Sequence, residues 1–147
     1  MKNLILVALL TALSLNAVAQ KAENVKKVTV PQVVEQAFKK DFPTVKKVTW
    51  SAEVKDFEAE FNLDGIATSA NYDKNGKLVE LEKGIKTEQL PVAALNFIMK
   101  NYSTYKISEA AKITKDTKVV TYEAEITKSG KSFDLIFDAN GHFLKKE

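Results

Sequence analysis

Residues 71 to 82 hold oxygen-bearing side chains at a spacing that resembles a calcium-binding loop. Counted from Asn71, oxygen ligands occupy the first, third and fifth places, a glycine the sixth, and Glu82 the twelfth. The alternative is a hairpin turn, because Asp and Asn followed by Gly accept the positive φ that such turns need. The second copy of the motif begins with Ile136, which offers no side-chain oxygen. The sequence therefore favours a turn at both places.

Two glutamate pairs could also do chemistry, because each has the spacing Glu-x-Glu among alternating apolar residues. On a β-strand, residues two apart point to the same face, so both carboxylates of a pair would lie together. Hard cations favour such oxygens, but glutamates on the outer face of a strand are usually only solvated. We expect no burial to raise their pKa, and we expect them to face solvent or a partner. The four residues are Glu58, Glu60, Glu123 and Glu125.

Groups suited to catalysis are scarce in this chain. His142 is the single histidine, and it follows a glycine in a turn motif with no nucleophile motif beside it. The sequence has no cysteine, so it offers neither a thiol nucleophile nor a cysteine-rich metal site. We therefore predict a protein that is not an enzyme, with no catalytic residue, no metal site and no cofactor.

The chain repeats itself at a spacing of 122 − 57 = 65 residues. Residues 57–61, FEAEF, match residues 122–126, YEAEI. The same spacing carries residues 72–76, YDKNG, onto residues 137–141, FDANG. Two copies are too few for a solenoid, so a duplicated unit is the better interpretation.

Each copy has the pattern of one helix followed by strands. A proline opens each helix, where its missing N–H costs nothing, and apolar residues follow at helical spacing, as at Val34 and Phe38. Alternation with a period of two includes Phe57 and Tyr122, as a strand with one buried face requires. The predicted fold class is α+β: two tandem repeats, each one helix packed on about four antiparallel strands, forming a joined sheet backed by helices.

We place the first repeat at residues 29–84 and the second at residues 88–147. Within each repeat, the residues on the inward side of the strands should form the core. The core residues predicted in this way are Trp50, Phe57, Phe61, Leu135 and Phe137.

The N-terminal residues have the features of a secretory signal peptide. Lys2 precedes an apolar run, and small residues ending at Ala19 supply a cleavage site. The run is too short to span a membrane, and no cysteine precedes Gln20 to carry a lipid. We assign residues 1–19 to the signal peptide and residues 20–28 to a flexible lead. A periplasmic or secreted protein with no stable membrane insertion is expected.

The charge pattern argues against binding to nucleic acid. The 22 basic residues are all lysine, and they are scattered among 19 acidic residues rather than gathered into a patch. A chain without arginine also lacks the fork geometry that grips phosphate in bidentate fashion.

Taken together, these features resemble the β-lactamase-inhibitor-like, PepSY-like domains of exported bacterial proteins. The resemblance implies α+β units whose sheets join into a broad surface backed by helices. It also implies a non-enzymatic role in the cell envelope, where members bind or restrain a protein partner. The matching segments are Val30-Pro31, Phe38, Phe42-Pro43, residues 48–50 (VTW), 57–61 (FEAEF) and 72–76 (YDKNG), Leu90-Pro91, and residues 137–141 (FDANG).

The resemblance implies a docking surface as well. Inhibitor relatives place a concave sheet face and hairpin loops on a β-lactamase, and Asp64 matches their acidic loop. Those relatives use disulfides and an aromatic-rich face, whereas this chain has no cysteine and offers glutamates there. Inhibition of a β-lactamase itself is therefore not expected. A structural or ligand-sensing domain with no enzyme target is the alternative. The candidate partner-binding residues are Glu58, Glu60, Asp64, Glu123 and Glu125.

The turn interpretation of residues 73–76 makes a direct prediction about calcium. A ligand that binds only the folded state raises the melting temperature, so millimolar calcium should leave the melting temperature of this protein unchanged. Thermal unfolding with calcium and with a chelator measures the effect. A calcium-dependent rise that disappears in Asp73→Ala or Glu82→Ala would restore the metal-loop hypothesis.

Overall fold

The computed structural model describes residues 28–52 and 54–147. The expected signal peptide and nearly all of the expected lead at residues 20–28 lie outside the described residues. The first half of the fold contains α1 (Gln32–Asp41), β1 (Val48–Ala52), β2 (Asp56–Leu63), β3 (Ile66–Asp73) and β4 (Leu78–Gly84). The second half contains the 3₁₀ helix η1 (Thr87–Gln89), α2 (Val92–Asn101), β5 (Lys106–Lys115), β6 (Val120–Lys128), β7 (Lys131–Asp138) and β8 (Phe143–Lys146).

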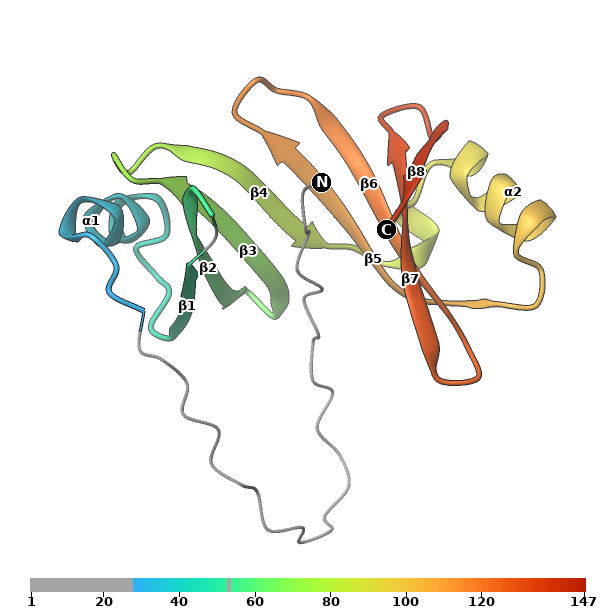
Figure 1. Ribbon diagram of the computed structural model, residues 1–147, viewed down its shortest axis with the longest axis horizontal. Helices are drawn as coiled ribbons and strands as arrows, with labels where there is room; N and C mark the ends of the chain where they lie inside the picture. Colours follow the sequence, from blue (N-terminus) through green and yellow to red (C-terminus); the bar gives the residue numbers. More distant parts are fainter. Residues whose placement is uncertain (1–27, 53) are drawn as a thin grey trace, which may run out of the picture.

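All eight strands form one antiparallel sheet whose spatial order follows the chain order, β1 to β8. The predicted α+β class is therefore correct, and the two helices lie at opposite ends of the sheet (Figure 1). The two halves meet where residues 80–84 of β4 pair with residues 111–115 of β5. In the described part of the chain, no helix is long and apolar enough to cross a membrane.

Both helices are short and amphipathic, and they begin and end in the same way. Pro31 and Pro91 occupy the position before the first helical residue, where the absence of an N–H leaves no bond unmade. Two apolar residues four apart, Val34 and Phe38 in α1, are then buried against the sheet. Ala94 and Ile98 do the same in α2.

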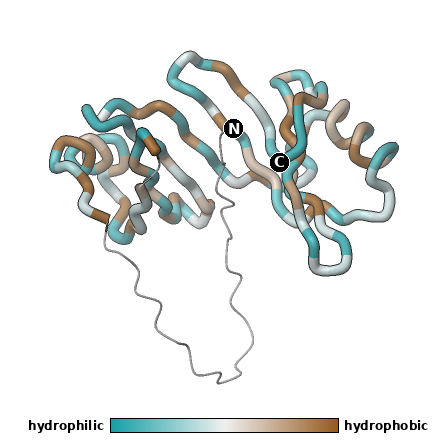
Figure 2. The backbone as a smooth tube through the Cα atoms, in the orientation of Figure 1, coloured by the Kyte–Doolittle hydropathy of each residue, from teal (hydrophilic) through white to brown (hydrophobic). Residues whose placement is uncertain are grey.

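Each helix covers its own core, and the two described buried clusters share no residue. In the first core, the ring of Phe38 lies 5.1 Å from that of Phe61, edge to face. The hydroxyl of Tyr72 donates a hydrogen bond of 3.0 Å to Asp41 at the end of α1. Figure 2 shows polar and apolar residues interspersed along the strands, as sheets with one covered face require.

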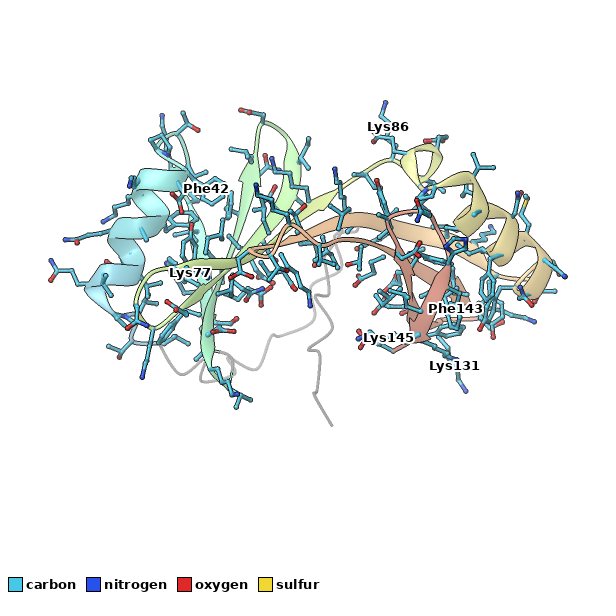
Figure 3. All side chains as sticks on the ribbon, turned by 90° about the horizontal axis from the view of Figure 1, so that it is seen from above. Phe42, Lys77, Lys86, Lys131, Phe143 and Lys145 are labelled. Carbon is cyan, nitrogen blue, oxygen red and sulfur yellow. The ribbon has the colours of Figure 1, made fainter. Side chains whose placement is uncertain are left out.

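The core predictions are mostly confirmed. Phe61, Leu135 and Phe137 are buried, whereas Trp50 and Phe57 are half-buried at the margin of the first core. Trp50 lies on β1, an edge strand of the described sheet, so only β2 among the described strands lies beside it. In Figure 3, Phe42 lies by α1 and Phe143 lies towards α2, at opposite ends of the molecule.

The two Asp-x-Asn-Gly segments are hairpin turns. The Asp73 carboxylate accepts hydrogen bonds from the backbone amides of Asn75 (2.8 Å) and Lys77 (2.9 Å). Asp138 accepts them from Asn140 and His142, both at 2.8 Å. These carboxylates organise the turn backbone, which is the role that the turn interpretation predicts. His142 lies in the second turn, directly before β8.

The glycine of each turn also packs against the first turn of the helix in its own half. A Cβ on Gly76 would lie 2.9 Å from the carbonyl oxygen of Val33. A Cβ on Gly141 would lie 2.7 Å from the Cβ of Pro91 and 2.8 Å from the amide nitrogen of Ala94. Glycine is required here both by its positive φ and by this close approach of turn and helix.

This contact predicts that two glycine-to-alanine substitutions should lower the free energy of unfolding by different amounts. Gly130→Ala should cost about 1–2 kcal/mol through its positive φ alone, because nothing lies within 4 Å of its added methyl. Gly141→Ala adds the clash with α2 and should cost about 1–3 kcal/mol more. Denaturant unfolding of both variants measures the difference. Equal costs would show that the turn does not pack against the helix.

Candidate functional site

The strand register places all four predicted glutamates on the side of the sheet opposite the helices. Residues directly paired across antiparallel strands share a face. Glu60 pairs with Ser69, which pairs with Glu82, whereas Phe61 in the helix-covered core points the other way. In the second half, Glu123 pairs with Ala111 and with Ile136.

Further carboxylates lie on this face that sequence reasoning missed. Glu109 pairs with Glu125, which pairs with Asp134, so three acids line up across β5, β6 and β7. Apolar neighbours on both sides were a signal that could have identified Glu80 and Asp134, whereas Glu109 follows Ser108 and lies at a register shift of β5. We call the following set the acidic face: Glu58, Glu60, Glu80, Glu82, Glu109, Glu123, Glu125 and Asp134.

The acidic face is less exposed than the sequence predicted. Glu58 is only 9% exposed, and Glu60, Glu123 and Glu125 are half-buried, so the expectation of solvated glutamates is wrong for Glu58 and inexact for the others. The cause lies in the sheet itself. Side chains on the same face, such as Ile113 and Ile136, are 6% exposed although no described helix covers them. Neighbouring strands therefore shield side chains on the helix-free side of the sheet from solvent.

Burial and mutual repulsion raise the pKa of several of these acids. The pKa of Glu123 rises to about 8, chiefly through burial and then through the charges of Glu82 and Asp134. Burial likewise raises the pKa of Glu82 to about 7, with Glu80 as the next cause. The expectation that nothing raises the pKa of the glutamates is thus wrong for Glu60 and Glu123. The reason is that the pattern of one strand does not reveal the acids on its neighbours.

The same causes act more weakly elsewhere on the acidic face. Burial raises the pKa of Asp134 to about 6, with Glu125 as the next contributor. The pKa of Glu60 rises through burial and the charge of Glu58. The pKa of Glu109 rises through burial and the charge of Glu125.

Few cations balance these charges within the described residues. Lys115 lies 3.6 Å from the Glu80 carboxylate, and Lys145 pairs with Glu147 beside the face. The hydroxyl of Ser108 donates a hydrogen bond of 2.5 Å to Glu125. No group of three His, Cys, Asp or Glu side chains in the described residues is arranged to hold a metal ion. The gathered carboxylates are therefore suited to attract positive charge.

A groove of about 820 Å³ opens on the acidic face where the two halves join. Its polar lining includes Glu60, Glu82, Glu109 and Glu123, and Ala67 and Ala111 contribute to its apolar lining. Asp64, the other predicted contact residue, is exposed at the tip of the β2–β3 hairpin with a φ of 53°. The next residue, Gly65, lines the groove, so Asp64 lies near its rim.

The raised pKa values predict that stability falls as the pH rises. An acid whose pKa is higher in the native state holds its proton more tightly there, so loss of protons favours unfolding. The loss should begin above the ordinary pKa of 4.5 and continue to about pH 8, where Glu123 titrates. Denaturant unfolding between pH 4 and pH 9 measures the slope.

Two substitutions isolate the contribution of single acids to this pH dependence of stability. Glu82→Gln and Glu123→Gln should each stabilise the protein at pH 9 by about 1–3 kcal/mol, with little gain at pH 4. Glu35→Gln, on an exposed position of α1, is the control and should change neither value. If neither Glu82→Gln nor Glu123→Gln reduces the pH dependence of the free energy of unfolding, the two acids do not have the environment that the structure shows.

The same fold occurs in solved structures of other bacterial proteins. One reported as a putative periplasmic protein from Bacteroides eggerthii has a TM-score of 0.74 at 18% identity, covering 82% of this chain and 89% of its own. A DUF2874 family protein from Bacteroides uniformis has a TM-score of 0.71 at 20% identity, covering 80% and 88%. A BLIP-like protein from Bacteroides fragilis has a TM-score of 0.63 at 20% identity, covering 82% and 86%.

Comparison with functionally curated proteins found no match. The sequence does match a family model, described as "Putative beta-lactamase-inhibitor-like, PepSY-like", once over residues 16–80 and again over residues 55–145. These two matches together cover most of the chain, including both helices and all but the end of β8. The chain therefore belongs to the PepSY-like, β-lactamase-inhibitor-like family.

Proposed function

We propose that this chain is a non-enzymatic, exported binding module that holds a basic protein partner on its acidic face. The observation that carries the proposal is a helix-free sheet face on which acids from both halves are gathered and partly buried. The raised pKa values of Glu82 and Glu123 support it, because a cation placed beside them would relieve their mutual repulsion. The two helix-plus-four-strand halves serve as tandem copies of one unit, each supplying half of the face.

Export is supported by the features of the first nineteen residues and by the putative periplasmic description of the Bacteroides eggerthii relative. A binding role is supported by the family description and by the BLIP-like description of the Bacteroides fragilis relative. Restraint of an envelope enzyme is one form that such binding takes. The chain offers few exposed aromatic anchors on this face and no arginine, so the affinity should be modest and sensitive to salt.

A comparison of capture by variants tests the proposal. Purified protein is crosslinked to a periplasmic extract at low and high salt, and the captured proteins are identified by mass spectrometry. Glu60→Gln/Glu125→Gln removes two charges from the acidic face, and Glu35→Gln/Glu88→Gln removes two from exposed positions outside it. We expect basic partners that the first variant and high salt lose and that the control keeps, because charged contacts control encounter.

The opposite result is equally clear. If the wild type and the acidic-face variant capture the same proteins in the same amounts, the acidic face is not the binding surface. Thermal unfolding of each variant verifies that any loss of capture does not arise from unfolding.

A further inference from the structure

The groove on the acidic face lies at a gap in the sheet. The pairing of β4 with β5 covers residues 111–115 of β5 and stops there, apart from one bond from the Ile85 amide to the Ala110 carbonyl. Residues 106–109 of β5 continue along β6, and within the described residues no strand lies on their other side, although η1 contacts β5. Ile66 and Ala67 at the start of β3 lie beyond the residues of β3 that pair with β4, but Gly84 lies beside them, since a Cβ on Gly84 would be 3.4 Å from the Ala67 carbonyl oxygen.

Both segments line the groove, and residues 106–109 of β5 are the open strand end. Ile66 and Ala67 contribute to its lining, as do Ser108 and Glu109. Ser108 and Glu109 are exposed, as is Ile66. A strand edge without a partner presents amide and carbonyl groups that another extended chain can pair with.

We propose that the groove receives an extended segment of the partner that adds as a strand to residues 106–109 and carries lysine or arginine at alternate positions. The inference rests on the proposed function and names the kind of partner. A strand added here would continue the sheet, so every second side chain would point to the acidic face. Glu82, Glu109 and Glu123 line the groove on that side and would receive the cationic groups.

The charges around the groove favour this edge over the two outer edges of the sheet. Lys46 and Lys47 precede β1, and Lys145 and Lys146 lie on β8, so cationic segments are repelled from both outer strands. Lys86 lines the groove and Lys106 lies on the open end of β5. The carboxylates that line the groove outnumber these two lysines. Apolar residues at the alternate positions of the segment would face the helix side.

A synthetic peptide tests the inference with the full-length mature protein. The probe is acetyl-Thr-Lys-Val-Lys-Val-Lys-Thr-amide, which puts all three lysines on one side of an extended chain. A matched peptide with acetylated lysines keeps the stems and removes the charges. We expect the first peptide to bind, and we expect Glu109→Gln or Glu123→Gln to weaken binding about tenfold or more, while Glu35→Gln leaves it unchanged.

Strand pairing is tested separately from charge. Alternate residues of a strand point their amides to opposite edges, so N-methylation of the lysines and N-methylation of the valines block different edges of the probe. We expect one pattern to abolish binding and the other to leave it intact. We also expect hydrogen exchange at residues 106–109 to slow when the unmodified peptide binds.

The outcomes separate this inference from the proposed function. If both N-methylated peptides bind equally and exchange at residues 106–109 is unchanged, strand addition is wrong, although the acidic face still attracts basic ligands. If the unmodified peptide does not bind at all, the inference is also wrong, and the capture experiment decides the proposed function alone.

Discussion

The pairing of β4 with β5 is the constraint on which the rest of the structure depends. Each half has its own helix and its own buried cluster, so the described cores could exist without touching one another. Residues 80–84 and 111–115 join them, and this ladder fixes which face of one half continues into the other. A slip of one residue would turn the acids of one half to the helix side of the other. The acidic face is therefore a product of this register.

The same join explains why the acids are perturbed. Glu82 lies on β4 in the first half and Glu123 lies on β6 in the second, yet Glu82 is the leading charge that raises the pKa of Glu123. Carboxylates that are partly buried and close to one another cost folding energy when all are ionised. A protein that maintains such a face loses stability near neutral pH, and under the proposed function a cationic partner would offset that loss on binding. The proposed function would therefore link stability and recognition through one set of side chains.

The sequence predicted the elements well and the environment of the acids poorly. Local signals were sufficient for the helix at Pro31, the turns at Asp73 and Asp138, and the strand containing Phe61, because each depends on neighbouring residues. The burial of Glu58 and the alignment of Glu109 with Glu125 depend on which strands become neighbours, and on how the sheet encloses its own face. The groove arises where pairing between two distant segments stops, and periodicity within either segment carries no information about that point.

Titration of individual carboxyl groups by NMR, with ¹³C-labelled glutamate, tests the central claim most directly. In the wild-type protein Glu123 should titrate at about pH 8. In Glu82→Gln the pKa of Glu123 should fall, because the largest charge contribution from across the junction of the two halves is gone. A pKa of Glu123 near its ordinary value of 4.5 in the wild type, or a raised value that Glu82→Gln leaves unchanged, would contradict the gathering of acids from both halves on one enclosed face.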